Sequence, residues 1–375
     1  MSSRRYHNYF FKTTSKNYKN NDINNNYSNE YFLNSQYLHT LVIMSPCVTY
    51  KNAEKELLIR ISLYCKEKNI DFIEIDGKGR VVLENHKLFN LNISSLPVNN
   101  KITVISVHEL NKKLSDHYTL LACWNPVLFI TSNCLNIRSY DGYLSSYSES
   151  IDSFVSCIND NDKFCGYLNT SLPISLLEEI EIIDNPRIFY IGTNWDLLEV
   201  NKNSQNIIRG KIREFLKILD TRDMINIYGP EKINKKYTWE GYNTYCGEID
   251  FDGFSVIKKI KETGICLALS TQQHIRSKVC SMRIFEGIAA GVPIICDKNP
   301  FFIKYFGDNV FYIDLINIED DIIKIEEYID YFKNNKNDVL KKINTCREIF
   351  IKKFSFDVQF ANIINKIRKE DVIKI

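Results

Sequence analysis

One stretch of the chain combines a carboxylate with the expected start of a helix. It runs from Ser281 to Asp297 and reads SMRIFEGIAAGVPIICD. The N-terminus of a helix presents free amide hydrogens and a partial positive charge, which suit a bound phosphate. Glu286 stands early in this helix, where its carboxylate can accept hydrogen bonds from ribose hydroxyls beside that phosphate. Taken alone, the stretch also fits an ordinary helix followed by a buried strand.

The end of the expected helix is equally well marked. Gly291 ends it where a side chain would be strained, and Pro293 prevents its continuation. The apolar residues after Pro293 predict a buried strand, and another is predicted at 265–269. A strand, this helix and a second strand are therefore the elements that must position Glu286.

A second group of candidate residues lies in the first half of the chain. His108 and Glu109 directly follow the predicted strand at 102–107. A histidine or carboxylate at the end of a strand can deprotonate a substrate hydroxyl, so both are candidate catalytic residues. The sequence does not choose between them and four other candidates, which are Asn52, Glu54, Asp141 and Glu149.

Two tripeptides match the letters of an Asp-x-Asp metal motif, at Asp160–Asp162 and Asp250–Asp252. Neither directly follows a clear apolar strand, which is the context that this motif needs. We interpret the first as a polar loop and the second as an N-cap region. The 11 cysteines include no Cys-x-x-Cys pair, so a zinc knuckle is not expected. We predict no metal site.

The composition bounds the class of protein. With 375 residues, the chain is long enough for two domains with separate cores. Its 48 basic and 46 acidic residues give no electrostatic case for nucleic acid or membrane binding. Cysteines beside apolar runs indicate reduced thiols, and neither a transmembrane run nor a signal peptide is visible, so we expect a cytoplasmic protein. Basic clusters at 352–353 and 366–369 leave peripheral membrane contact open, with solvated helix faces as the alternative.

The chain divides into four segments. Residues 1–38 are rich in Asn, Tyr, Ser and Lys, which predicts a poorly ordered extension. Strand-like and helical runs alternate in 39–184 and again in 185–350. This predicts an α/β protein with two doubly wound, Rossmann-like domains facing a cleft. The last segment, 351–375, predicts a helix that crosses back to the first domain. The strands expected in the first domain are 41–44, 72–75, 102–107 and 127–130.

The second domain contains a recognisable order of short motifs. In chain order they are a strand ending at Gly192, Ile227-Tyr228-Gly229, Tyr245-Cys246-Gly247, Leu267–Ser270, Arg283–Glu286, Gly291-Val292-Pro293 and Phe306-Gly307-Asp308. This order resembles the C-terminal half of GT-B glycosyltransferases of the "glycosyl transferases group 1" kind, especially the CgeB-like branch. The resemblance covers 185–350, and in 39–184 it rests on the alternation of strands and helices alone.

The resemblance implies a nucleotide-sugar site around the expected helix. In the family, the glutamate that corresponds to Glu286 holds the ribose, and backbone amides near Met282 and Arg283 face the diphosphate. Many relatives carry a second glutamate eight positions earlier, where this chain has Lys278. That departure puts the contact to the donor sugar and the stereochemical outcome in doubt. Arg283 either contacts phosphate or braces Glu286.

Further donor-binding residues follow from the same resemblance. Three potential cations precede the helix, and two of them, Arg276 and Lys278, are expected to stabilise the leaving diphosphate; His274 is the third. Basic residues at 209 and 211 open another helix and can reach the diphosphate in such enzymes. The remaining donor-binding candidates are Gly192, Thr193, Asn194, Arg209, Lys211, Gly229 and Gly247. Exposed helix starts, solvated loops and turn chemistry are the competing explanations.

The resemblance implies a metal-independent glycosyltransferase without a cofactor, since the nucleotide-sugar is a substrate. We expect it to act in surface polysaccharide biosynthesis, with 39–184 binding a glycan or lipid-linked acceptor and no nucleic acid. Two other functions remain open at this point. One is a nucleotide-sugar epimerase, which would need carboxylates in both domains. The other is a non-catalytic nucleotide-binding or maturation protein with a degenerate site.

Overall fold

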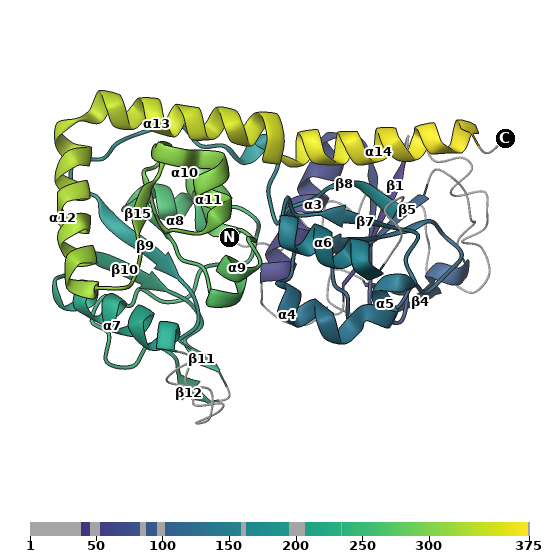
Figure 1. Cartoon of the computed structure of the whole chain (residues 1–375), viewed down its shortest axis with the longest axis horizontal. Coiled ribbons are helices and arrows are strands. Elements are labelled where there is room, and N and C mark those ends of the chain that lie inside the picture. Colours follow the sequence, from purple (N-terminus) through teal and green to yellow (C-terminus); the bar gives the residue numbers. More distant parts are fainter. Residues whose placement is uncertain are drawn as a thin grey trace, which may run out of the picture. The chain divides into compact units, whose positions relative to one another are not determined.

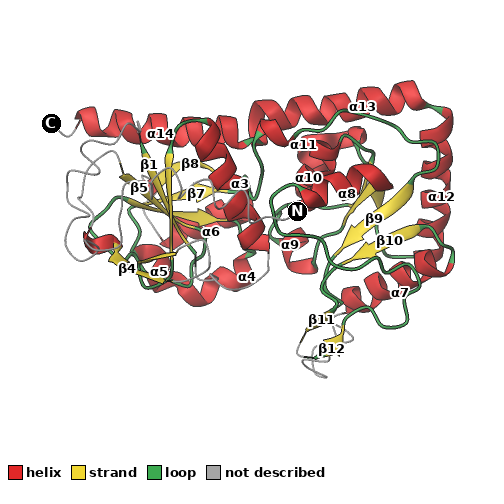
Figure 2. Ribbon diagram, turned by 180° about the vertical axis from the view of Figure 1, so that it is seen from behind, coloured by secondary structure: helices red, strands yellow, loops and turns green. Residues whose placement is uncertain are grey.

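The structure is a computed structural model that describes residues 39–45, 53–82, 88–95, 102–158, 163–194, 207–233 and 235–373. It consists of two compact units (Figures 1 and 2). Unit 1 contains the described residues up to Pro173, the segment Phe251–Gly253 and the residues from Phe356 onward. Unit 2 contains Ile174–Asp250 and Phe254–Ser355. Each unit is an α/β structure around its own sheet.

The sheet of unit 1 has eight strands in the order β4-β3-β2-β1-β5-β6-β7-β8. The strands β2, β1, β5, β6, β7 and β8 are parallel, whereas β3 and β4 pair in antiparallel fashion. We call the edge at which parallel strands end the carboxyl edge. The strands are β1 (Thr40–Met44), β2 (Asp71–Ile75), β3 (Arg80–Val82), β4 (Leu88–Asn92), β5 (Ile102–Ser106), β6 (Thr119–Cys123), β7 (Gly142–Ser145) and β8 (Phe164–Tyr167).

A buried apolar cluster joins this sheet to α3 (Ala53–Glu67) and to the C-terminal helix α14 (Phe356–Ile373). The ring of Tyr64 in α3 stacks on that of Phe360 in α14, with 5.1 Å between ring centroids. Backbone atoms of the loop after β8 also bind this helix, because the amide of Asn169 donates to Gln359 Oε1 at 2.6 Å. The other helices of unit 1 are α4 (Val127–Ile130), α5 (Cys134–Arg138) and α6 (Glu149–Ile158).

The short segment Phe251–Gly253 is fastened to α3 by a buried ion pair. Arg60, which is fully buried, donates from Nε to the carbonyl of Gly253 at 3.0 Å and pairs with Glu56 at 3.2 Å. Glu56 in turn accepts a hydrogen bond from the Gly253 amide at 3.1 Å. The predicted N-cap region at Asp250–Asp252 lies directly before α8. This segment is docked on a helix, and Phe254 occupies the N-cap position of α8 without a side-chain cap.

The sheet of unit 2 has five parallel strands in the order β10-β9-β13-β14-β15. They are β9 (Arg187–Ile191), β10 (Ile225–Tyr228), β13 (Gly264–Ala268), β14 (Ile294–Asp297) and β15 (Phe311–Ile313). A two-stranded hairpin of β11 (Lys232–Ile233) and β12 (Lys236–Tyr237) follows β10. These segments are runs rich in β-branched and aromatic residues, most of them buried, as is typical of parallel strands. Strands β10 and β15 lie at the two edges of the sheet.

Helices cover both faces of this sheet. On one face α7 (Ile207–Thr221) packs with α12 (Ile318–Asn334), and on the other α8 (Ser255–Thr263) packs with α10 (Arg283–Ala290), which contacts α13 (Lys336–Ile349). The remaining helices are α9 (Gln272–Arg276) and α11 (Pro300–Phe306). Short turns of 3₁₀-helix lie at Ile93–Ser95, Thr131–Asn133, Ile174–Leu176 and Gly307–Asn309, and a π-helical segment spans Phe350–Phe354.

The α/β class with two Rossmann-like units is confirmed. The strand predicted at 127–130 is wrong, because these residues form α4 with Leu128 64% exposed. A short apolar run does not by itself distinguish a strand from a helix, and here Pro126 precedes a helical turn. The predicted extension at 1–38 lies outside the described residues. No helix in the described part of the chain is long and apolar enough to cross a membrane.

Candidate functional site

The first turn of α10 carries the charged residues that the sequence singles out. Glu286 is buried, with 1% of its side chain exposed, and its carboxylate is paired with the guanidinium of Arg283, which is 18% exposed. Met282 occupies the N-cap position without a side-chain capping bond. Because α10 follows β13, this turn lies at the carboxyl edge of the sheet, where open α/β sheets bind ligands. Of the two roles left open for Arg283, the geometry shows the contact to Glu286.

Close packing fixes α10 on the sheet. A β-carbon at Gly287 would lie 2.9 Å from the β-carbon of Cys266 in β13, so a larger residue would push the helix away. Gly291 ends the helix with a left-handed φ of 71°. Near this end Arg347 Nη2 donates to the carbonyls of Glu178 at 2.7 Å and Ile288 at 3.4 Å. A cation at the helix C-terminus complements the helix dipole, whose positive end lies at Arg283.

A buried polar network holds the loop that leads into α10. Asp297, at the end of β14, accepts hydrogen bonds from the backbone amides of Ser270 and, at 3.1 Å, of Asn299. The side-chain amide of Asn299 donates to Ser270 Oγ at 3.1 Å and to the carbonyl of Val279 at 2.8 Å. Burial raises the pKa of Asp297 to about 6. Our sequence analysis missed this network, although Asn299 before Pro300 is a signal for the helix cap that it forms.

Three predicted glycines meet at the ends of β9 and β10. The amide of Gly192 donates to Tyr228 at 3.1 Å, and the amide of Gly229 donates to Gly247 at 3.1 Å. Trp239 Nε1 donates to the carbonyl of Gly192 at 3.3 Å. These contacts bring the main chains of two strand ends together with the loop at 247.

Asn194 is the buried polar residue of this strand end. It follows β9 by three positions and is 7% exposed, yet its Nδ2 has no hydrogen-bond partner. An unpartnered buried amide is costly, on the order of 1–3 kcal/mol, and such groups are rare in folded proteins. A hydrogen-bond donor is therefore available next to Gly192. Thr193, between them, is half-buried.

The cations expected before α10 have different environments. Arg276, at the end of α9, is exposed, and Lys278 is half-buried with a left-handed φ of 53°. Burial lowers the pKa of His274, whose Nδ1 lies 2.7 Å from Thr271 Oγ1. Burial therefore favours the neutral form of His274, the third potential cation of this loop. Arg276 and Lys278 remain as the positive groups of this loop.

Lys211, near the start of α7, makes a contact that gives no support to a role at the diphosphate. Lys211 Nζ donates to the carbonyl of Ile316 at 2.9 Å, in the loop after β15. This contact fastens α7 to the neighbouring loop. Arg209 lies in the first turn of the same helix, but its side chain is outside the described part of the chain.

In unit 1, His108 and Glu109 lie together at the carboxyl edge of the sheet. His108 Nδ1 is 3.3 Å from Glu109 Oε2, and Asn125, which follows β6, donates to the same carboxylate oxygen at 2.9 Å. Glu109 is 2% exposed and His108 is 17% exposed. A carboxylate held behind a partly exposed imidazole can orient the ring.

The other carboxylates considered as catalytic candidates have different surroundings from the His108–Glu109 pair. Asp141 binds Lys113 at 2.7 Å and the amide of Thr119 at 2.7 Å, which joins β6 to the preceding loop. Glu149 is exposed in the first turn of α6, and Glu54 is half-buried in α3. Asn52 and the tripeptide at 160–162 lie outside the described residues.

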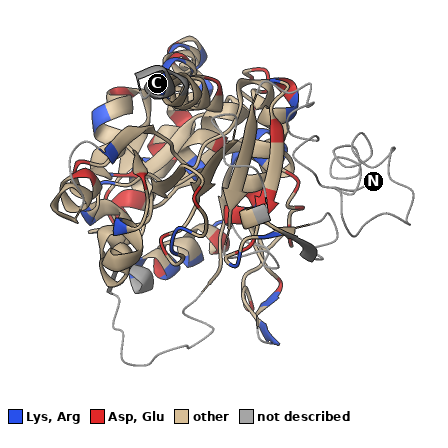
Figure 3. Ribbon diagram, turned by 90° about the vertical axis from the view of Figure 1, so that its right-hand side faces the viewer, with Lys and Arg blue, Asp and Glu red and all other residues tan. Residues whose placement is uncertain are grey.

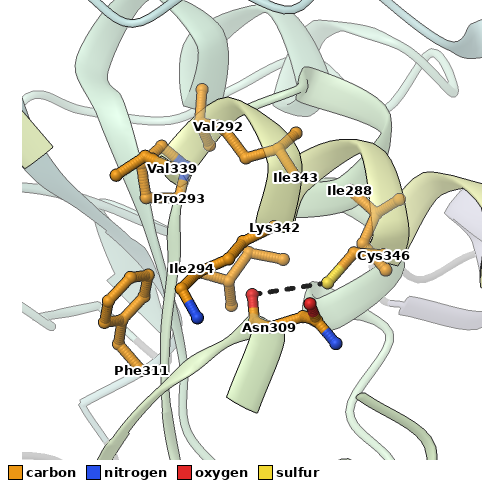
Figure 4. A pocket seen from close by; sticks show the side chains of 10 residues that line it. All are labelled: Ile288, Val292, Pro293, Ile294, Asn309, Phe311, Val339, Lys342, Ile343 and Cys346. Atoms are coloured by element: carbon orange, nitrogen blue, oxygen red, sulfur yellow. Dashed lines mark hydrogen bonds between the residues drawn. The ribbon is translucent and has the colours of Figure 1, made fainter. Parts of the chain in front are cut away.

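An apolar pocket lies elsewhere in unit 2 (Figure 4). Most of its lining is aliphatic, and Cys346 Sγ donates to the carbonyl of Asn309 at 3.5 Å. Pro293 and Phe311 place it at the amino ends of β14 and β15, opposite the edge that carries Glu286. The lining residues are Ile288, Val292, Pro293, Ile294, Asn309, Phe311, Val339, Lys342, Ile343 and Cys346.

Charged groups are interspersed over the ribbon rather than segregated by sign (Figure 3). Among the described residues, no group of three or more His, Cys, Asp or Glu side chains could hold a metal ion.

Comparisons with known proteins bear on the family and the fold. Residues 209–365 match the family described as "Glycosyl transferase-like". No curated protein sequence matches the chain. Among solved structures, one described as "alpha-glucosyltransferase in complex with UDP-glucose and DNA containing an abasic site" has 11% identity and a TM-score of 0.54, covering 89% of this chain and 100% of that one.

A second solved structure, "Crystal Structure of Glycosyltransferase from Rickettsia africae ESF-5", has 15% identity and a TM-score of 0.51, covering 90% of this chain and 98% of that one. Another, described as "alpha-glucosyltransferase in complex with UDP and a 13-mer DNA containing a HMU base", has 12% identity and a TM-score of 0.53, covering 88% and 100%. At such identities these likenesses establish the fold alone, which is that of the GT-B glycosyltransferases.

Proposed function

We propose that the protein transfers a sugar from a nucleoside diphosphate sugar to an acceptor hydroxyl, because residues 209–365 match a glycosyl transferase-like family and the chain has the GT-B fold. The observation that carries this proposal is the Arg283–Glu286 pair in the first turn of α10. The pair would offer a carboxylate to ribose and a cation to phosphate at one helix N-terminus, within the matched segment.

The donor would bind along the carboxyl edge of the sheet in unit 2. Ribose hydroxyls would bind Glu286, which frees Arg283 to turn toward the diphosphate. Negative charge grows on that diphosphate as the glycosidic bond breaks, and Arg276 and Lys278 would stabilise it without a metal ion. The unpartnered amide of Asn194 supplies one more donor, and the backbone at Gly192, Gly229 and Gly247 lets the nucleotide approach closely.

On the acceptor side, His108 would accept the proton of the attacking hydroxyl, with Glu109 orienting the ring. We propose a glycan or lipid-linked acceptor and a role in surface polysaccharide biosynthesis inside the cell. The net charge of +2 and the interspersed charges favour such an acceptor over a nucleic acid polyanion. Because two of the solved structures carry UDP or UDP-glucose, uridine diphosphate is the first nucleotide to test.

The test is a thermal-shift screen of the full chain against the nucleoside diphosphates and their sugars. A nucleotide at about 100 times its Kd should raise the free energy of unfolding by about 2.7 kcal/mol. Glu286→Gln should abolish that shift. The matched control is Glu262→Gln, which removes an ion pair of the same spacing from the neighbouring helix α8 and should leave the shift unchanged.

A chain that no nucleotide stabilises would overturn the proposed donor site. Release of nucleoside diphosphate from the stabilising donor in the presence of candidate acceptors then separates a transferase from a non-catalytic binding protein. DNA belongs among those acceptors, since two related structures contain it.

A further inference from the structure

The turn between β7 and α6 in unit 1 holds a tyrosine in a strained conformation. Tyr147 has a φ of 62°, in the left-handed region that bulky residues rarely adopt. Its amide donates to Ser145 Oγ at 3.0 Å, which helps to hold the turn. A non-glycine residue persists in such a conformation only when the surrounding structure imposes it, and such residues cluster at functional sites.

The side chain of this residue stacks on a second tyrosine. The rings of Tyr147 and Tyr167 are nearly parallel, with 4.0 Å between centroids and 6° between planes. A parallel stack of this kind presents flat ring faces, which suit packing against another flat or apolar surface. Tyr167 ends β8 and is 39% exposed, which leaves a ring surface open to solvent at the carboxyl edge.

The residue directly before Tyr147 carries a third unusual group, a side-chain hydroxyl. Ser146 is fully buried, and its hydroxyl has no hydrogen-bond partner. Buried hydroxyl groups normally find a partner, and each exception calls for an explanation. A strained backbone, a parallel ring pair and an unpartnered hydroxyl therefore occur within two consecutive residues and their neighbour on β8.

We propose that Ser146, Tyr147 and Tyr167 form a subsite for a pyranose ring of the acceptor. The apolar C–H face of the sugar would pack on the exposed tyrosine surface, and a sugar hydroxyl would reach Ser146 Oγ once the turn opens. A nucleobase also stacks on tyrosine, but its edges need several fixed hydrogen-bond partners, whereas this subsite offers one hydroxyl.

The position of this subsite fits the proposed function, on which this inference rests. Tyr147 and Tyr167 lie at the same edge of the sheet as His108, since β5 is separated from β7 only by β6. An acceptor sugar held here extends along the edge toward the proposed base. This inference assigns carbohydrate to the acceptor, at the residues that bind it.

The test uses ligand-observed saturation-transfer NMR on the full chain with a panel of methyl pyranosides, namely those of glucose, galactose, mannose and N-acetylglucosamine. At least one should receive saturation on its C–H face. Tyr147→Gly removes the ring and relieves the left-handed strain, so it should lower that signal at least fivefold while the melting temperature stays equal or rises. Ser146→Ala should weaken binding without lowering the melting temperature.

The matched control is Tyr237→Ala, which removes another exposed tyrosine, on the hairpin of unit 2, and should leave the signal unchanged. Absence of a signal for every pyranoside, or a signal that survives in both Tyr147→Gly and Tyr167→Ala, overturns the proposal. If uridine or adenosine monophosphate binds and this binding is lost in the same variants, the subsite binds a nucleobase. That result also overturns the proposal.

The thermal shift with uridine diphosphate separates this inference from the function on which it rests. If Tyr147→Gly keeps that shift but loses the pyranoside signal, both stand. If the shift is present but no pyranoside binds, the donor site stands and the acceptor subsite falls. If pyranosides bind but no nucleotide does, the proposed transfer reaction falls and the protein is a carbohydrate-binding protein.

Discussion

A β-carbon at Gly229 would lie 2.0 Å from the carbonyl oxygen of Gly192. The two glycines end adjacent parallel strands, so only the absence of a side chain lets the strand ends come this close. The φ of Gly229 is 152°, a region that other residues rarely adopt. This close contact, rather than the preference of turns for glycine, explains why position 229 is a glycine.

We therefore expect Gly229→Ala to separate the ends of β9 and β10. The backbone strain alone should lower the free energy of unfolding of unit 2 by about 1–3 kcal/mol, and the displaced Gly192 loop should weaken uridine diphosphate binding at least tenfold. Denaturant unfolding and calorimetric titration measure the two effects.

Gly247→Ala is the matched control. Gly247 also has a left-handed φ, of 96°, but a β-carbon there would meet no atom within 4 Å. This variant should show the cost of strain without the displacement of Gly192. Equal losses of binding in the two variants would contradict the importance of the Gly229–Gly192 contact.

The unpartnered amide of Asn194 leads to a prediction in which stability and binding change independently. Asn194→Ala removes a buried donor that has no partner, so the free chain should keep its stability or gain up to about 1 kcal/mol. Binding of uridine diphosphate should weaken about fivefold to tenfold, as expected for one lost hydrogen bond. Loss of stability without loss of affinity would show that Asn194 has a structural role only.

The pair of His108 and Glu109 predicts a loss of turnover without a loss of donor binding. His108→Gln should lower transfer by about 10²- to 10⁴-fold, which is the usual contribution of general acid–base catalysis. Glu109→Gln should lower it less, because the imidazole remains. The measurement is diphosphate release with acceptor minus release without it.

Asp141→Asn is the control for this experiment. Asp141 pairs with Lys113 and accepts a hydrogen bond from the amide of Thr119 at the amino end of β6, whereas His108 lies at the carboxyl edge of the sheet. It should affect stability and leave turnover per folded molecule unchanged. If His108→Gln transfers sugar at the full rate, the base lies elsewhere, and Glu149 becomes the next candidate.

The sequence predicted those helices and strands that have a clear hydrophobic periodicity and a glycine or proline at their ends. The helix of Glu286 ends at Gly291 as expected, because the left-handed conformation and Pro293 are local signals. The same reasoning failed at 127–130, where four apolar residues fit a strand and a helix equally well. It also did not detect β6 at 119–123, just upstream of that run.

The sequence predicted contacts within the candidate site only where the interacting residues lie close together in the chain. Arg283 and Glu286 are three positions apart on one helix, so their contact follows from helix geometry. The network of Asp297, Ser270 and Asn299 depends on two strands being neighbours in the sheet, which no local pattern reveals. The stacking of Tyr147 on Tyr167 depends in the same way on the pairing of β7 with β8.

Buried carboxylates predict how stability depends on pH. Burial raises the pKa of Asp71, in β2 of unit 1, from 3.8 to about 6, which outweighs the hydrogen bond from Thr40. Between about pH 4 and pH 6 the folded unit therefore keeps a proton that the unfolded chain has lost. The free energy of unfolding falls as pH rises through this window, by an upper estimate of about 3 kcal/mol.

Asp71→Asn should remove this contribution, so the variant should gain stability relative to the wild type at pH 7 and little at pH 4. Urea unfolding of both proteins at these two pH values measures it, with hydrogen exchange to separate the units, because the pKa of Asp297 in unit 2 is also raised to about 6. Asp223→Asn is the control of opposite sign, since Arg187 lowers the pKa of Asp223 and this carboxylate stabilises the fold at neutral pH. A wild-type pH dependence that survives unchanged in Asp71→Asn would show that Asp71 is ionised in the folded unit across this range.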